Sequence, residues 1–526
     1  MKIHPTFNTV RTESLTLLPL IFIGGLALLW FFPQVTANTT LQLTLVSTIV
    51  ILSGWHGILI ARKFPLSVAI SVRPQHYVQA CAQGSVLLYW GWYWREVYDS
   101  AYLLLAQILF AYAFDFLLSW SKRHSYALGF APVPVIFSIN LFLWFKPDWF
   151  YFQFLLIALG FLAKDFIRWK KDGRSAHIFN PSSFPLGVFS LCLILTGTTD
   201  LTWGQEIATT LNNAPQIYLF IFLISLPGQL LFGVTTMTMA AVITMYLFGL
   251  IYFAAIGTFY FYDAYIPIAV FLGMHLLFTD PSTAPRSELG RILFGIAYSL
   301  SVIVLYGALN ALGFPRFYDK LLAVPLMNLG IQSIDWFVRS QYAQYIDPSN
   351  LLRILKGKRR NLGYISIWTV IFVLMSANQG VGDTHRGHWI TFWKQACTEN
   401  LRNGCRHYGV LTSSYCNRGS GWACNEYGIL LQPQLRPELA RQAFQKACDF
   451  DFSAGCSNRE DDNLRKPLEQ EPSLADYKII VRQGKNPLPT LSQLQTYQEA
   501  CIQGFSDACE QACTLGDQKA CDLSSE

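Results

Sequence analysis

Ten of the twelve cysteines in this chain lie from Cys397 onward, in five pairs of identical C-x7-C spacing. Thiols at a fixed spacing can oxidise to disulfides or ligate a metal. Structural zinc sites use C-x2–4-C knuckles, so metal binding is the weaker alternative and we assign no metal ligand. No C-x-x-C-H haem attachment sequence is present either. The predicted disulfide pairs are Cys397 with Cys405, Cys416 with Cys424, Cys448 with Cys456, Cys501 with Cys509, and Cys513 with Cys521.

Helix geometry limits how such a pair can bond. One straight helix would hold Cys i and Cys i+8 about 12 Å apart, whereas a disulfide needs Cα atoms within about 7 Å of each other. If the cysteines of each pair are bonded, the bond must therefore span a turn between two helices. Glycines between the cysteines, such as Gly404 and Gly455, favour that turn. Because disulfides persist in oxidising compartments, the pairs also suggest that this part of the chain lies outside the cytoplasm.

Two polar stretches that contain proline could bind a ligand. The first motif is HIFNPSSFPLG (177–187) and the second is FTDPSTAP (278–285). Proline in a first helical turn sacrifices no hydrogen bond, and Asn, Asp, Ser and Thr cap helix starts. Paired breaks of this kind predict discontinuous helices that meet at a midplane site, where free N–H groups attract anions such as phosphate. The alternative is a pair of ordinary loop-to-helix junctions. The candidate binding residues are Asn180, Pro181, Ser182, Asp280, Pro281, Ser282 and Thr283.

The elements that must position these residues are membrane helices. The chain has 526 residues, of which 52% are hydrophobic and only 14% charged, so it is too apolar for a soluble protein of this size. About thirteen apolar segments lie between residues 15 and 378, and the sequence then becomes polar and rich in cysteine. We predict an all-α protein with a polytopic membrane domain (1–378) that carries the two discontinuous-helix motifs, followed by an αα-repeat domain (379–526).

The distribution of charge predicts the topology. If the N-terminus is cytoplasmic and the segments alternate, the basic clusters all fall on the cytoplasmic side. These are Arg62–Lys63, Lys122–Arg123, Arg168 to Arg174, Arg286 with Arg291, and Arg353 to Arg360. They are membrane-flanking loops next to lipid, not a nucleic-acid surface. An odd number of spans then places the C-terminal domain in the periplasm, and the chain is predicted to be a multi-pass protein of a bacterial-type inner membrane.

At the two motifs the sequence resembles the membrane subunits NqrB and RnfD of ion-pumping redox complexes, over roughly 73–339. The strings that carry this resemblance are HIFNPSSF and FTDPSTAP followed by GRILFG. The stretch from RPQHYVQACAQG to HIFNPSSF resembles stand-alone relatives found with enediyne biosynthesis genes. The resemblance implies internal pseudo-symmetry, a flavin such as FMN, electron exchange with a quinone, and other redox subunits as partners.

The resemblance is incomplete at one position. The family carries covalent FMN on the Thr of a motif like S-G-A-T-x-L, and the nearest string here, E-I-A-T-T-L, keeps Ala, Thr209 and Leu but lacks Ser and Gly. Thr209 is therefore a weak candidate for flavin attachment, and an ordinary loop threonine is the alternative. The cysteine pairs resemble Sel-one-like repeats, which implies a solenoid of helix pairs, each with one disulfide, that docks a partner protein.

These patterns predict an integral membrane electron-transfer subunit associated with a flavin, a quinone or both, and with no assigned catalytic residue. Two alternatives come from other classes. Broken helices at a midplane also suit a transporter or channel. A non-catalytic scaffold or assembly factor is the other alternative, in which the repeats carry the function.

Overall fold

A computed structural model describes residues 9–460 and 512–524, with gaps at 11–12, 172, 263, 349–357, 379, 383–384, 389, 418–420, 432–436, 451 and 515. It is 77% helix and 4% strand, which confirms the prediction of a mostly helical protein. The chain divides into two compact units. The first comprises Met1–Tyr246 and Ile268–Ala377, and the second comprises Leu247–Pro267 and Asn378–Glu526. The sequence predicted one boundary, at 378/379, and so placed the segment 247–267 in the membrane domain. In the structure this segment belongs to the same unit as the tail.

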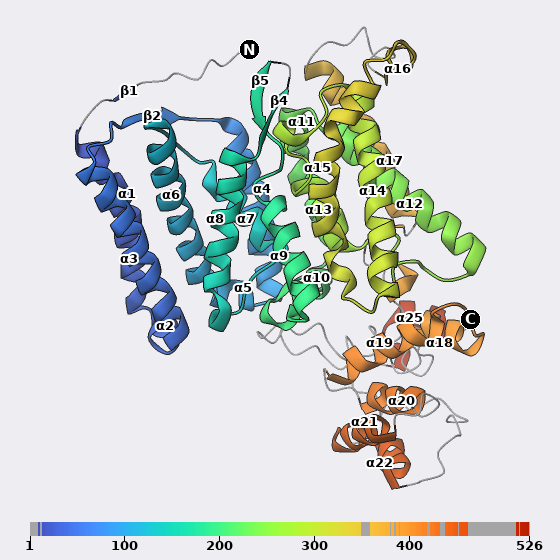
Figure 1. The fold of residues 1–526 in the computed structure, drawn as a ribbon. Helices are drawn as coiled ribbons and strands as arrows, with labels where there is room; N and C mark the ends of the chain where they lie inside the picture. Colours follow the sequence, from blue (N-terminus) through green and yellow to red (C-terminus); the bar gives the residue numbers. More distant parts are fainter. Residues whose placement is uncertain are drawn as a thin grey trace. The chain divides into compact units, whose positions relative to one another are not determined.

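The first unit contains most of the helices (Figure 1). They are α1 (Leu18–Leu28), α2 (Pro33–Thr36), α3 (Thr39–Ala61), α4 (Pro74–Tyr93), α5 (Glu96–Asp99), α6 (Ala101–Arg123), α7 (Pro132–Asn140), α8 (Tyr151–Phe166), α9 (Ser183–Thr196), α10 (Gly204–Thr210), α11 (Ile217–Phe232), α12 (Thr235–Ile256, which ends in the second unit), α13 (Ile268–Leu276), α14 (Glu288–Ala311), α15 (Asp319–Phe337), α16 (Gln341–Tyr345) and α17 (Lys358–Ala377).

Five helices among the described residues are long and apolar enough to cross a membrane: α3, α6, α12, α14 and α17. A sixth span is formed if the segments Gly204–Asn213 and Ile217–Phe232, bent by 101°, count as one. This agrees with a membrane protein. Two of the about thirteen apolar segments of the sequence, at 127–146 and 264–279, are wrong as continuous membrane-spanning helices. They contain only the nine-residue helices α7 and α13, each about 13.5 Å long, against a hydrocarbon core of about 30 Å.

Each short helix connects two long helices that run in the same direction. Along α6 and α8, Gln153 contacts Gln107 at 3.1 Å and Asp165 contacts Arg123 at 3.1 Å, so the pair is parallel. In α12 and α14, Thr236 donates to Glu288 at 2.8 Å. One turn or more further along, Ser299 donates to the carbonyl of Ala241 at 2.6 Å. A parallel pair requires the chain to return between its members, and α7 and α13 lie on these two returns.

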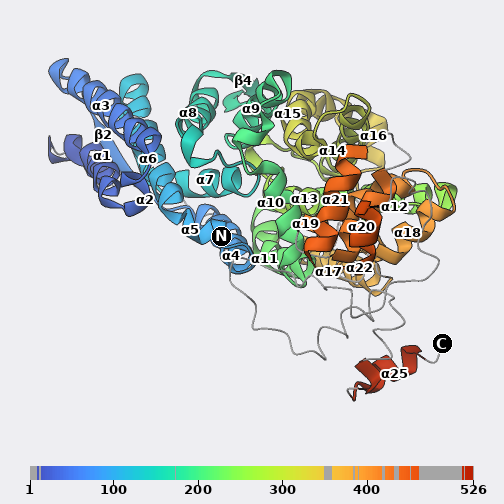
Figure 2. The ribbon, with the colours of Figure 1, turned by 90° about the horizontal axis from the view of Figure 1, so that it is seen from below.

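Strands are few and short. β1 (Thr9–Val10), β2 (Ser67–Ser71) and β3 (Ser125–Gly129) form a sheet in that order, with β1 antiparallel and β3 parallel to β2. β4 (Arg168–Lys171) and β5 (Arg174–His177) form an antiparallel hairpin that follows α8 and leads into the first motif. Helices α8, α9 and α15 lie side by side in Figure 1 and in Figure 2, which brings the first motif next to α15.

The tail contributes the helices of the second unit. They are α18 (Ile390–Thr398), α19 (Gly404–Asn417), α20 (Gly421–Leu431), α21 (Pro437–Asp449), α22 (Ser453–Glu460) and α25 (Gln518–Ser524).

Four of the five predicted cysteine pairs are disulfides in the structure, with Cα–Cα distances between 4.2 and 4.6 Å. The bonds join Cys397 to Cys405, Cys416 to Cys424, Cys448 to Cys456, and Cys513 to Cys521. The first three each connect consecutive helices, which confirms that the bond spans a turn. The remaining predicted pair, Cys501 and Cys509, lies outside the described residues.

The segment 257–267 is packed into the tail. Phe259 is 2% exposed and its ring lies 4.9 Å from that of Phe392. The hydroxyl of Thr258 donates to the carbonyl of Arg402 at 2.9 Å. This loop and the tail therefore form one folded body. Close helix approach in the tail depends on a small residue, because a Cβ on Gly404 would lie 2.5 Å from the carbonyl oxygen of Ala396.

Candidate functional site

The first motif begins α9 through the side chain of Asn180, which is 5% exposed. Its Oδ1 accepts hydrogen bonds from the N–H groups of Ser182 and Ser183, at 2.9 and 3.2 Å, and from the Ser182 hydroxyl at 2.7 Å. Gly160 of α8 lets this turn pack closely, because a Cβ there would lie 2.3 Å from the carbonyl oxygen of Pro181. The amides expected to attract phosphate are therefore occupied by the motif's own side chain.

The second motif forms a turn instead of a helix start. Asp280 accepts from the N–H of Ser282 at 3.0 Å and from the hydroxyl of Thr283 at 3.1 Å, which closes one 3-10 turn over Pro281–Thr283. Pro285 then disfavours helix at the residue before it, and α14 begins only at Glu288, capped by Ser287. The expectation that Asp280 starts a membrane helix is wrong for this reason. Pro281 and Ser282 are exposed at the rim of the site.

The two motifs lie against each other. The Asn180 side chain donates to the carbonyl of Leu277 at 3.1 Å. Asn328 of α15 bridges them, since its Oδ1 accepts from the Asn180 N–H at 3.2 Å and its Nδ2 donates to the Thr283 carbonyl at 3.3 Å. His177, at the end of β5, faces Asp280 with 3.9 Å between Nε2 and Oδ2. Segments about a hundred residues apart in sequence thus form one site, which we call the two-motif site.

The electrostatics of the two-motif site centre on Asp280. Burial alone would raise the pKa of this carboxyl group. The opposing effects of His177, the Ser282 N–H and the Thr283 hydroxyl are larger, so the pKa is lowered from its usual value. The ionised Asp280 carboxylate can accept a hydrogen bond from a donor on a ligand. Among the described residues, no group of three His, Cys, Asp or Glu side chains is arranged to hold a metal ion.

Thr209 is not brought to this site. It lies exposed on α10, where its hydroxyl donates to the carbonyls of Gln205 and Glu206 at 3.2 and 3.1 Å. In Figure 1, α10 lies at the opposite end of the first unit from the β4–β5 hairpin, which leads into the first motif. A flavin attached at Thr209 would therefore not share a pocket with His177.

Sequence reasoning missed two residues of the site. Asn328 lies within the apolar helix α15 and is 1% exposed, and an amide buried in an apolar helix is itself a signal for a polar contact. His177 is the first residue of the first motif, and nothing in its spacing in the sequence indicates that it faces Asp280. Two other polar residues are buried in long apolar helices, Asp115 in α6 and His56 in α3, and both have partners. Asp115 lies 3.9 Å from Lys164, and the His56 ring contacts the Thr16 carbonyl at 2.8 Å.

Comparisons with family models, with curated proteins and with solved structures give no match for this chain. Its function is therefore argued from the geometry above.

Proposed function

We propose that this protein is an integral membrane electron-transfer subunit that handles a flavin or a quinone at the two-motif site. One observation carries the proposal: His177 and Asp280 face each other at 3.9 Å beside the exposed rim residues Pro281 and Ser282. Reduction of a flavin or a quinone takes up protons, and a histidine that faces a carboxylate is a residue type that can act in such proton transfers. Asn328 joins the two motifs that contain this pair, through its hydrogen bonds to Asn180 and Thr283.

Residues of the rim would contact the cofactor directly. Ser282 is exposed, and the Asp280 carboxylate can accept a hydrogen bond from a flavin N–H or a quinol O–H. The N–H groups at the start of α9 already donate hydrogen bonds to Asn180, so we do not propose that a phosphate binds at that helix start. FMN would need its phosphate recognised elsewhere, which favours the isoalloxazine ring or a quinone ring as the group held here.

The test is an absorption spectrum of the detergent-purified full chain, oxidised and then reduced with dithionite, with extraction and identification of quinones. We expect a flavin or a quinone to copurify, and Asp280→Asn and His177→Gln to lower its content several-fold. Asp200→Asn, on an exposed 3-10 turn, is the matched control and should retain it. Wild-type protein that carries neither cofactor would refute the proposal.

Transport is the second candidate, and the two parallel helix pairs favour it. Short helices returning between long parallel ones resemble the broken helices that form midplane substrate sites in transporters. The test is uptake of a solute into proteoliposomes. If the wild type supports uptake and a folded Asp280→Asn variant does not, transport is favoured over redox chemistry.

The tail is proposed to be a periplasmic, disulfide-bonded helical repeat that docks a partner protein. Support comes from the consecutive helices joined by disulfides, which resemble the Sel-one-like arrangement. Alkaline phosphatase fused after residue 526 should be active, because that enzyme needs an oxidising compartment. If alkaline phosphatase were active only when fused after the Arg62–Lys63 loop, the assigned orientation in the membrane would be reversed.

A further inference from the structure

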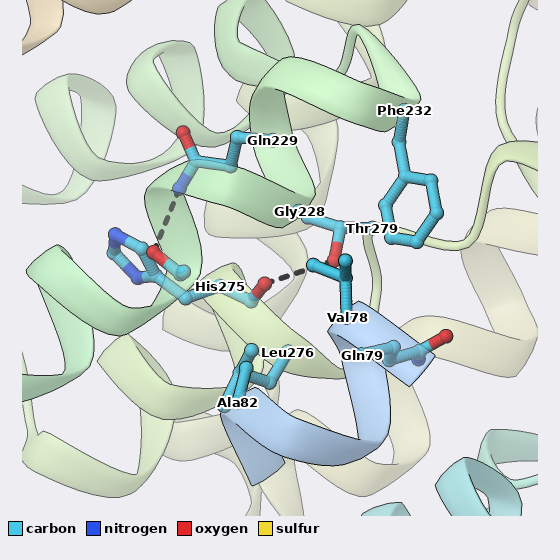
Figure 3. A pocket seen from close by; sticks show the side chains of 10 residues that line it. Val78, Gln79, Ala82, Gly228, Gln229, Phe232, His275, Leu276 and Thr279 are labelled. Carbon is cyan, nitrogen blue, oxygen red and sulfur yellow. Dashed lines mark hydrogen bonds between the residues drawn. The ribbon is translucent and has the colours of Figure 1, made fainter. Parts of the chain in front are cut away.

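The cavity in Figure 3, lined by residues of α4, α11 and α13, has a volume of about 10 Å³, which is room for one water-sized group. A larger ligand does not fit there. An open surface of a different kind lies at the end of α8 from which β4 and β5 continue (Figure 1). The cationic residues of this surface, which we call the basic corner, are Lys122 and Arg123 of α6, Lys164 of α8, and Arg168 and Lys170 of β4.

The basic corner lies where membrane helices end. Lys122 and Arg123 are the last two residues of α6, which is a candidate membrane span. α8 ends at the same level, because Asp165 near its end contacts Arg123 at 3.1 Å. α3 is another candidate span and also ends here, since the Phe64 ring that follows it lies 5.3 Å from the ring of His124. Cations at the ends of membrane spans lie among lipid headgroups.

Carboxylates compensate only part of the charge of this corner. α6 and α8 each contain one acidic residue, Asp115 and Asp165, and both are buried. Arg123 pairs with Asp165 at 3.1 Å, and Lys164 lies 3.9 Å from Asp115. These two pairs neutralise two of the five cations.

Lys122 and Arg168 are exposed and keep their charge uncompensated. The Lys122 ammonium group donates to the carbonyl of Asp165 and lies 3.9 Å from the centre of the Phe166 ring. Arg168 donates to the carbonyl of Lys164 at 3.2 Å, and its other acceptors are the hydroxyl and the carbonyl of a serine in β5. All of these acceptors are uncharged. Because the two cations bind the carbonyls of consecutive residues, their charged groups lie at the same turn of α8.

An exposed apolar stripe runs along α8 toward the basic corner. Leu155, Leu162 and Phe166 are 55%, 36% and 61% exposed. Their positions in the sequence place them on one face of the helix. The stripe ends at the Phe166 ring, which also contacts Lys122. A molecule with an anionic head and an apolar chain matches both parts of this surface.

We infer that the basic corner binds an anionic phospholipid, whose phosphate contacts Lys122 and Arg168 and whose acyl chain lies along the stripe of α8. Each lysine or arginine close to an anionic headgroup strengthens such binding by about fivefold. A zwitterionic phospholipid also has a phosphate, but its choline group is cationic and is repelled by the same corner. The inference does not depend on a cofactor at the two-motif site.

The test is equilibrium binding of two phospholipids to the delipidated, detergent-purified full chain, measured by native mass spectrometry. The probes are dioleoylphosphatidylglycerol and dioleoylphosphatidylcholine, which have the same acyl chains and differ in the net charge of the head. We expect the wild type to bind the phosphatidylglycerol at least about tenfold more tightly. The double variant Lys122→Gln with Arg168→Gln should lower this preference to about threefold or less. The matched control, Arg95→Gln with Lys146→Gln, removes two cations that precede the opposite ends of α6 and α8 and should keep the preference.

Equal binding of the two lipids to the wild type would overturn the inference and leave these cations for a soluble partner. A preference that persists in the double variant, or that the control loses to the same extent, would also overturn it, because net charge alone would then explain the binding. Millimolar inorganic phosphate should displace little of the lipid, and full displacement would show a site for free anions instead of a lipid. If the double variant fails to fold, Lys122→Gln alone decides the question and should lower the preference several-fold.

Discussion

Replacing Asn328 by leucine tests the joint between the two motifs. The substitution keeps the branched shape and the number of heavy atoms of this buried side chain but removes both of its hydrogen bonds, to the Asn180 N–H at 3.2 Å and to the Thr283 carbonyl at 3.3 Å. A buried polar group left unpaired costs about 1–3 kcal/mol. Both bonds are long for N–H···O contacts, so we expect a total loss of about 2–3 kcal/mol in the free energy of unfolding.

The assay is thermal unfolding in a mild detergent, followed by tryptophan fluorescence. For a large unit a loss of this size lowers the Tm by about 4–6 °C. Leu329→Ala is the control, since Leu329 is the next residue of α15 and is 55% exposed, and it should change the Tm by no more than about 1 °C. If Asn328→Leu unfolds at the same temperature as this control, Asn328 does not hold the motifs together and the reasoning is refuted.

Three further predictions concern stability. Gly160→Ala should cost about 1–3 kcal/mol, because its Cβ would meet a carbonyl at 2.3 Å, whereas Gly54→Ala has open space and should be neutral or stabilising in thermal unfolding. The lowered pKa of Asp280 means that its stabilisation is present above about pH 4 and lost as the pH falls through its folded pKa. The Tm of Asp280→Asn should accordingly depend less on pH below about pH 4, and an unchanged acid profile would contradict this. Removing the disulfide between Cys448 and Cys456, which closes a short loop of sequence separation 8, should cost about 2–3 kcal/mol and speed proteolysis of the tail in the full chain.

The sequence predicted features that depend on local geometry. The spacing of Cys397 and Cys405 excludes a disulfide within one helix, and the bond does span two helices. Apolar length likewise predicted α3 and α6 as spanning helices. In both cases the residues that decide the structure lie close together in the sequence.

Features that depend on distant contacts were not predictable. Asp280 followed by proline has the pattern of a helix start, but Pro285 ends the turn and delays α14. The role of Asn328 requires knowing that α9 and α15 are neighbours. Hydropathy alone also cannot separate a nine-residue helix flanked by apolar extended chain from a full span, as in α7.

The packing of Phe259 into the tail has a consequence for how the protein is made. The segment 257–267 is synthesised before the tail that buries it, which begins at Asn378. Until the tail has been synthesised, the Phe259 ring lacks its contacts with Phe392 and Trp393. Assembly of the second unit must therefore be completed after α17 has been translated, and a chain shortened at residue 378 would leave this aromatic loop without its contacts to the tail. Such a truncation removes a folding partner of that loop as well as the proposed docking domain.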